Sequence, residues 1–147
     1  MENESVSLAY DELKRADHLM FVSLKYTRTV DVIKSIIERL MNAVNYGFEV
    51  LLQDAKKKKR ISDVPSLHKL RIESVRSLYP EYASYVDFYL LLRKIDKAEF
   101  ERTLEYRRHV CMTAVVEGGR LHITIDIVQD YYEKAKEFID VVASSNS

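Results

Sequence analysis

Apolar residues recur every three to four positions through the first third of the chain, which is the spacing of an amphipathic helix. The stripes consist of Ala9, Leu13, Ala16, Met20 and Leu24 within residues 8–27, and of Ile33, Ile36, Leu40, Val44, Gly47 and Leu51 within residues 30–55. Thr29 precedes the second stripe and is the expected N-cap, because its hydroxyl can accept a hydrogen bond from a free N–H of the first turn. Gly47 lies on the apolar side, where a missing side chain lets another helix approach closely. The pattern predicts two long antiparallel helices.

Shorter helical segments follow. Ser62 or Asp63 begins one of them, Pro65 falls near its first turn, and Pro80 ends it. The next segment, residues 81–95, carries the aromatic residues Tyr82, Tyr85, Phe88 and Tyr89. Such a stripe is more often part of a core or a subunit interface than a platform for stacked bases.

The middle of the second half of the chain allows two interpretations. Residues 96–99 have the form of a capping box and predict a helix from residue 97 to about residue 115. Residues 110–116 are rich in β-branched side chains, and apolar and polar residues alternate in residues 121–126. A small hairpin across Gly118 and Gly119 is therefore the alternative.

A final helix is expected after Thr124 or Asp126, with the apolar stripe Val128, Tyr131, Ala135, Phe138 and Val142. Neither an internal repeat nor an interdomain linker interrupts the pattern. The sequence predicts an all-α fold, an up-and-down bundle of five to six helices in one domain spanning residues 1–147. A short hairpin around residues 115–125 is the alternative for that segment.

Composition narrows the class of protein. The chain has 147 residues, 47% of them hydrophobic and 31% charged, which is typical of a globular domain with a real core. The 23 basic and 23 acidic residues balance, so any site for a polyanion must come from local clustering of cations. The acidic N-terminus lacks an apolar core, and no window of 18 residues is uninterruptedly apolar, so neither a signal peptide nor a membrane span is expected.

Two local features bear on location and binding. Cys111 is the single cysteine, so no internal disulfide can form, and we expect a buried thiol in a cytoplasmic protein. The cations Lys56–Arg60 form a run that fits a solvated helix end, because cations suit the C-terminal end of the helix dipole. A patch that contacts phosphates is the functional alternative for this run.

Several kinds of site have no signature in the sequence. The three glycines, at positions 47, 118 and 119, do not form a phosphate-binding loop. No pair of cysteines and no pair of histidines has the spacing of a zinc site, so neither a metal nor a cofactor is expected. His18, His68 and His122 are interpreted as structural or solvent-exposed residues.

The predicted helix 97–115 places two reactive side chains together. On a helical wheel Arg102 and His109 differ by only about 20° in direction and lie opposite the apolar face. Tyr106 and Thr113 flank them. The apolar face consists of Phe100, Leu104, Cys111, Ala114 and Val115. An arginine, a histidine and small polar groups would thus share one ridge.

The segment Arg102–His109 matches the Arg-x4–6-His pattern of the HEPN superfamily (higher eukaryote and prokaryote nucleotide-binding domains), and the predicted order of helices resembles that superfamily loosely over nearly the whole chain. The resemblance implies a metal-independent ribonuclease that acts as a dimer. In that role His109 would transfer a proton and Arg102 would hold the phosphate, with Arg108, Thr113 and Tyr106 as candidate substrate-binding residues. Seven residues separate the pair by about 10.5 Å along one helix, so a homodimer, in which arginine and histidine come from different copies, is expected.

Three functions remain open from the sequence. The first is a HEPN-like protein that binds or cleaves RNA or binds a nucleotide. The second is a non-catalytic helical dimer or interaction module, for example a partner of a nucleotidyltransferase, in which the stripe from Tyr82 to Tyr89 would form the interface. The third is a small-molecule pocket between the helices.

Overall fold

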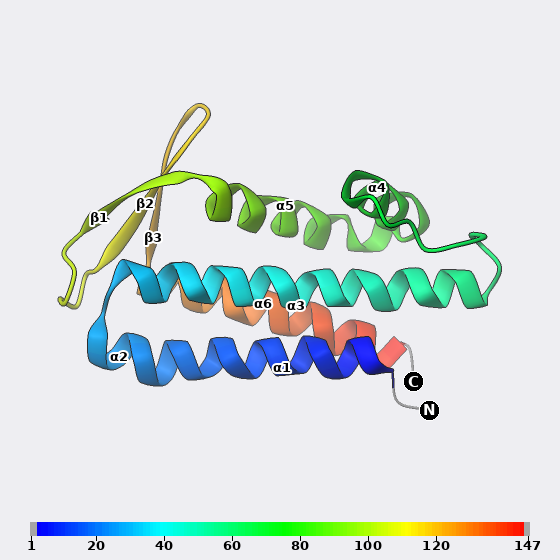
Figure 1. The fold of residues 1–147 in the computed structure, drawn as a ribbon, viewed down its shortest axis with the longest axis horizontal. Helices are drawn as coiled ribbons and strands as arrows, with labels where there is room; N and C mark the ends of the chain where they lie inside the picture. The colour runs from blue at the N-terminus through cyan, green and yellow to red at the C-terminus, as the bar shows by residue number, and fades with distance from the viewer. Residues whose placement is uncertain (1–2, 146–147) are drawn as a thin grey trace.

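The computed structural model describes residues 3–145. In chain order the helical elements before the sheet are α1 (Glu4–His18), the π-helical turn η1 (Leu19–Ser23), α2 (Leu24–Thr27), α3 (Val30–Lys57), α4 (His68–Leu78), the 3-10 turn η2 (Pro80–Tyr82) and α5 (Ala83–Lys97). They are followed by β1 (Glu99–Thr103), β2 (Cys111–Val116), β3 (Gly119–Thr124) and α6 (Ile125–Ser145). Figure 1 shows long helices lying side by side and a small sheet at one end of them.

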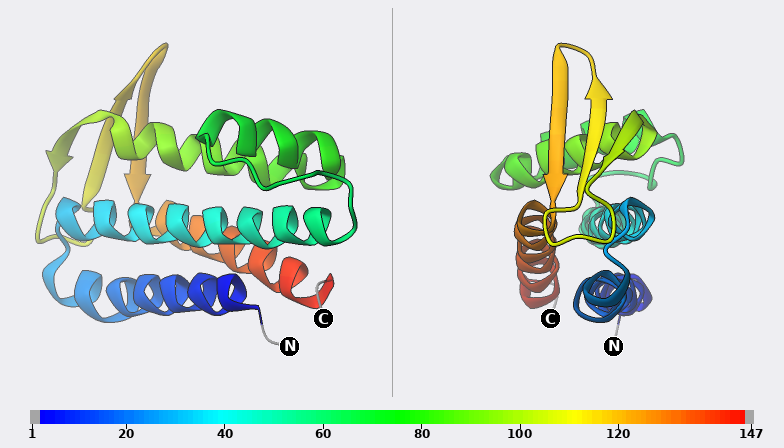
Figure 2. Two further views of the ribbon diagram at one scale, coloured as in Figure 1. Left: turned by 45° about the vertical axis from the view of Figure 1, so that its right-hand side comes forward. Right: turned by 90° about the vertical axis from the view of Figure 1, so that its left-hand side faces the viewer.

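The longest helix, α3, lies at the centre of the bundle. It packs against α1 and α6 on one side and against α5 on the other, as two views show (Figures 1 and 2). Thr29 caps it as predicted: the Val32 N–H donates to the Thr29 hydroxyl oxygen at 3.3 Å. The prediction of two long antiparallel helices at the start of the chain is confirmed.

Gly47 lies at a close contact between α3 and α6. A Cβ atom at this position would lie 2.6 Å from Cε2 of Phe138 and 2.9 Å from Cδ1 of Ile139. Both distances are shorter than van der Waals contact, so only a residue without a side chain lets the two helices pack here. The packing role expected for Gly47 is confirmed.

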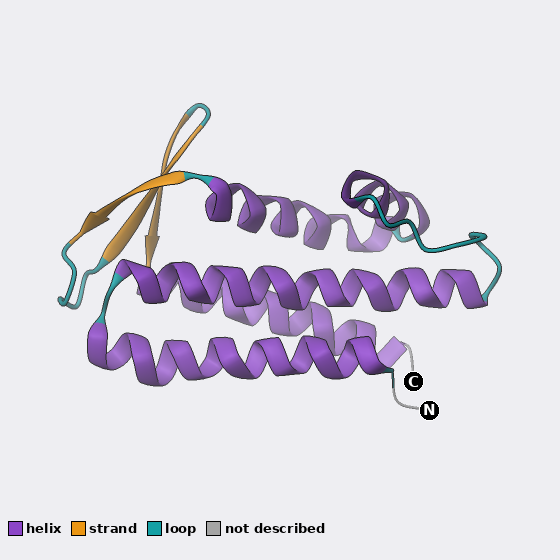
Figure 3. Ribbon diagram, viewed as in Figure 1, coloured by secondary structure: helices purple, strands orange, loops and turns teal. Residues whose placement is uncertain are grey.

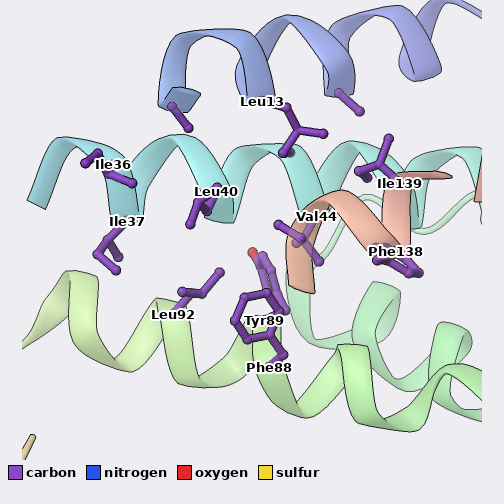
Figure 4. Close-up of a cluster of buried hydrophobic side chains, with 14 of the residues drawn as sticks. Leu13, Ile36, Ile37, Leu40, Val44, Phe88, Tyr89, Leu92, Phe138 and Ile139 are labelled. Atoms are coloured by element: carbon purple, nitrogen blue, oxygen red, sulfur yellow. The ribbon is translucent and has the colours of Figure 1, made fainter. Parts of the chain in front are cut away.

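The aromatic residues of α5 contribute to the core. Phe88 and Tyr89 are buried, and Phe48 packs edge-on against both Tyr89 and Phe138. Figure 4 shows the rings of Phe88, Tyr89 and Phe138 among the helices of the bundle, next to the aliphatic side chains of the core. The aromatic stripe therefore belongs to the core, which was the first of the two interpretations that the sequence favoured.

The predicted helix from residue 97 to residue 115 is wrong, and with it the all-α fold class. This stretch contains β1, β2 and the loop between them, and β3 completes an antiparallel sheet of three strands in the order β1-β2-β3 (Figure 3). Asp96 does not cap a new helix. It lies in the last turn of α5, where its backbone carbonyl and its carboxylate accept hydrogen bonds from Nζ of Lys34 at 2.8 and 3.3 Å.

The hairpin across Gly118 and Gly119, the alternative from the sequence, is present. Both glycines have positive φ angles, 91° and 152°, which β-branched residues avoid and which close the turn between β2 and β3. Along β2 successive side chains point to opposite faces of the sheet, and Met112 and Ala114 are fully buried against the helices. The β-branched composition of this strand fits a pleated sheet with one face on the core better than a helix.

Candidate functional site

One end of the bundle combines the features expected of a binding site. It is formed by residues 20–29, around η1 and α2, and by residues 104–109, the loop between β1 and β2, and is called the end surface below. The backbone N–H of Tyr106 donates to the carbonyl oxygen of Arg28 at 2.9 Å, so the two segments are held directly together. In Figure 1 the loop lies beside the junction of α2 and α3.

Side chains of the loop and of the end of β1 hold the loop against the start of α3. Oε2 of Glu105 accepts a hydrogen bond from the backbone N–H of Val30 at 3.0 Å and thereby caps α3. Nη2 of Arg102 donates to Oδ1 of Asp31 at 2.7 Å, and Nη1 of Arg102 lies 3.7 Å from Oε2 of Glu105. The hydrogen bond from Arg102 holds the pKa of the Asp31 carboxyl below its usual range. Arg102 thus joins the sheet to the bundle.

Unusual backbone geometry is concentrated at the end surface. Arg28, Leu104 and Tyr106 have φ angles of 48°, 53° and 66°, in the left-handed region that residues other than glycine rarely adopt. The η1 segment is π-helical, a rare conformation that is frequent at functional sites. Such strain persists only where the surrounding structure enforces it. Here the Tyr106–Arg28 and Glu105–Val30 hydrogen bonds do so.

This geometry leaves large apolar and aromatic side chains in solvent. Tyr26 is 80% exposed and Tyr106 is 75% exposed, so both rings have free faces. Phe21, Val22 and Leu104 are exposed as well. A group of exposed apolar residues on two neighbouring segments is typical of a surface that binds a ligand or a partner.

The same surface carries cations without acidic partners. Lys25 and Arg28 come from the first segment, and Arg107 and Arg108 come from the loop; among the residues that the structure describes, none of the four forms an ion pair. Residues 18–30 and 106–116 contain no Asp or Glu at all. A locally positive potential therefore arises on a chain whose net charge is zero.

The run Lys56–Arg60 differs from this surface in its contacts. Lys56 and Lys58 pair with Asp63 and Asp54 at 3.1 and 3.0 Å. Arg60 donates to the backbone carbonyl of Leu78 at 2.8 Å and stacks over the Tyr79 ring. Three of the five cations are therefore engaged within the chain. All five are exposed, as expected of a solvated helix end.

Two adjoining pockets open on the end surface. The first has a volume of about 330 Å³ and is lined by Arg108, His109, Thr124, Ile125 and Asp126. The second has a volume of about 400 Å³ and is lined by Met20, Phe21, Leu24, Lys25, Arg28, Ile125 and Gln129. Ile125 lines both pockets, so a ligand larger than one pocket could occupy both.

Only some of the site residues predicted from the sequence lie close to one another in the structure. Arg108 and His109 line one pocket, and Tyr106 lies in the same loop. Arg102 lies in β1, does not line the pocket and is bound to Asp31. The ridge that joined Arg102 to His109 was a property of the predicted helix, and it does not exist in a strand and a loop.

Thr113 lies elsewhere, on the face of the sheet away from the helices. Its hydroxyl is 3.1 Å from Nδ1 of His122 and 3.7 Å from Sγ of Cys111. Cys111 is half-buried on that face and not in the core, so the expectation of a buried thiol is wrong. The alternation of side chains along β2 is the reason, because it places positions 111 and 113 opposite Met112 and Ala114.

The contribution of the first segment to the end surface was not predicted from the sequence. Lys25, Arg28, Phe21 and Tyr26 belong to the end surface, although they lie about eighty residues before the loop. The break in the helical pattern at residues 25–29 and the absence of acidic residues from residues 18–30 were the available signals. Neither of them shows which distant segment lies beside this one.

Comparisons with protein-family models, with curated proteins and with solved structures gave no significant match to this chain. Within residues 3–145, no cluster of three His, Cys, Asp or Glu side chains could hold a metal ion, and no helix is long and apolar enough to cross a membrane.

Proposed function

We propose that this protein binds single-stranded RNA through the end surface. The observation that carries the proposal is the interleaving of unpaired cations with exposed aromatic rings: Lys25 and Arg28 flank Tyr26, and Arg107 and Arg108 follow Tyr106. Proteins that bind single strands combine cations along the backbone of the nucleic acid with aromatic faces on which unpaired bases stack. Both kinds of side chain, cations and exposed aromatic rings, are present here on two segments that are joined by a hydrogen bond.

The chemistry of the first pocket supports a finer proposal, that the bound RNA is cleaved without a metal. His109 would accept the proton of a 2′-hydroxyl, whose oxygen then attacks the adjacent phosphorus. The guanidinium of Arg108 would stabilise the charge that develops on the phosphate oxygens. The 5′-oxygen leaves with a proton from solvent or a second acid, which yields a 2′,3′-cyclic phosphate and a 5′-hydroxyl. Arg108 replaces Arg102 in this scheme, because Arg102 is bound to Asp31.

The test of binding is fluorescence anisotropy with a labelled single-stranded RNA and, for comparison, the matching duplex and single-stranded DNA. We expect the double variant Arg107→Glu/Arg108→Glu to lose binding and Tyr106→Ala to weaken it. Affinity for the wild type should fall steeply with salt, because cations that neutralise phosphates release counterions.

A matched control for this experiment is available on another part of the chain. Lys57 and Lys69 are exposed cations in α3 and α4, and the variant Lys57→Glu/Lys69→Glu changes the net charge by the same amount. Equal loss of affinity in the two double variants, or wild-type affinity in Arg107→Glu/Arg108→Glu, would contradict binding at the end surface.

A further inference from the structure

The face of the sheet that points away from the helices, called the outer face below, has no partner among the described residues. The strand register defines its members: Glu99, Glu101 and Thr103 from β1, Cys111, Thr113 and Val115 from β2, and Arg120, His122 and Thr124 from β3. The opposite face is buried against the bundle through Met112, Ala114 and Ile123. An open face on a small sheet is a candidate interaction surface.

Charge is distributed over the outer face in an ordered way. On β1 the ionisable residues are the acids Glu99 and Glu101, and on β3 they are the bases Arg120 and His122. The central strand contributes only small uncharged side chains. The face therefore has an acidic side and a basic side separated by a row without charge.

We infer that the outer face binds the outer face of a second copy of this chain, with the two-fold axis running along β2. Such an axis places β1 of one copy over β3 of the other. By the register, Glu99 then faces the partner's Arg120 and Glu101 faces the partner's His122. The same two contacts recur on the other side of the axis, so two Glu–Arg pairs of opposite charge and two Glu–His contacts form.

The register disfavours a two-fold axis that runs across the strands. An axis running across the strands through the row of Glu101, Thr113 and His122 would place each of these residues over its own copy. Glu101 would then face glutamate, and like charges repel. Of these two axes, only the one along β2 makes the face complementary to itself.

The central row suits close packing of two sheets. Facing sheets lie about 10 Å apart, and small side chains such as Cys111 and Val115 can meet across that gap. Thr113, between them in the row, is only 4% exposed within the chain and adds little contact area. Val115 is 41% exposed although it is apolar, and the axis places it against its own copy. This row forms an uncharged centre, and the ion pairs form a polar rim, as in known interfaces.

One contact within the chain must change when the copies meet. Nη2 of Arg120 lies 3.1 Å from Oε1 of Glu101, so this pair reaches over the central strand. Both side chains are at least half exposed, and exposed ion pairs contribute little to stability. Exchanging this pair for one between Arg120 and the partner's Glu99 therefore costs little.

The size of the face predicts a weak dimer. Three strands of five to six residues present about 300 Å² per copy, compared with about 800 Å² per partner in a standard interface. We expect self-association that depends on concentration. The inference does not rest on RNA binding, although an axis along β2 would place the two end surfaces at the same end of the dimer.

The experiment is a charge-swap test by sedimentation equilibrium at high protein concentration. One variant carries Glu99→Lys and Glu101→Lys, and the other carries Arg120→Glu and His122→Glu. Each variant alone should dimerise about tenfold more weakly than the wild type or worse, because like charges then face each other. An equimolar mixture should associate about as well as the wild type, because in a heterodimer of the two every acidic side chain again faces Lys, Arg or His. Circular dichroism checks that both variants are folded.

Cys111 provides an independent measurement, because it is the single cysteine and lies near the proposed axis. A short bis-maleimide should link two copies of the wild type covalently. The control Cys111→Ser/Val141→Cys, with its cysteine at an exposed position of α6, should not be linked. A monomer at all concentrations, dimerisation unaffected by either charge variant, or failure of the mixture to recover would each overturn the inference.

Discussion

The Glu105 carboxylate accepts a hydrogen bond from the Val30 backbone N–H at 3.0 Å, and so a residue of the β1–β2 loop caps the longest helix of the bundle. This contact ties the position of Tyr106, Arg107 and Arg108 to the rigid start of α3. The cationic loop is therefore held in place although its side chains are exposed. This arrangement suits a binding surface, because a loop that is ordered before binding loses less entropy when it binds.

Glu105→Ala should destabilise the protein by about 1 kcal/mol, the usual cost of removing a helix cap. The mean hydrogen-exchange protection of residues 104–109 should fall with it. Glu105→Gln keeps an oxygen that can accept the Val30 hydrogen bond, so it should destabilise the protein less than Glu105→Ala. The comparison separates the contribution of the hydrogen bond from that of the negative charge. Urea unfolding measures the free energy. Unchanged protection in Glu105→Ala would show that the loop is held by other contacts.

The ion pair between Arg102 and Asp31 predicts a measurable titration. Because the hydrogen bond from Arg102 lowers the pKa of Asp31 in the folded state, this contact stabilises the fold above the ordinary pKa of an aspartate. The stabilisation is lost as the pH falls through the depressed value. We expect NMR titration of Asp31 to give a pKa below the usual 3.8. In Arg102→Ala the value should return to the ordinary range; a pKa that stays low would assign the shift to another group.

Gly47→Ala should destabilise the protein. The added Cβ would lie 2.6 Å from Cε2 of Phe138, a fully buried ring that is itself packed against Phe48. Overpacking of this kind costs about 1–3 kcal/mol, against which the better helix propensity of alanine returns about 1 kcal/mol. Thermal unfolding of Gly47→Ala, with Ser35→Ala at an exposed position of α3 as the control, measures the balance. A stabilised Gly47→Ala would mean that α6 shifts easily.

Metal-independent cleavage of RNA should depend on His109. In the presence of a chelator, His109→Ala should abolish cleavage and leave RNA binding close to the wild type, because Arg107, Arg108 and the aromatic rings remain. His18→Ala removes a histidine at another exposed position and serves as the control. Cleavage by His109→Ala at the wild-type rate would remove the catalytic part of the proposal and leave the binding part standing.

Most helices of this fold could be predicted from the sequence, since the spacing of apolar residues that defines them is local. The stripe from Ile33 to Leu51, the cap at Thr29 and the close contact at Gly47 all appear in α3 as expected. The same reasoning was wrong for residues 97–115. There the apolar residues fitted a helical wheel and also the alternation of a strand, and local spacing could not distinguish the two.

What the sequence determined by itself is thus the helical bundle, the turn at Gly118 and Gly119, and the two segments that lack acidic residues. The tertiary structure decided that these two segments meet, that Arg102 binds Asp31, and that Arg108 and His109 share a pocket. The physical reason is the distance along the chain between the residues that interact. Periodicity, caps and turns depend on neighbours a few residues apart, whereas the end surface depends on contacts such as that between Arg28 and Tyr106, which form only when the sheet packs on the bundle.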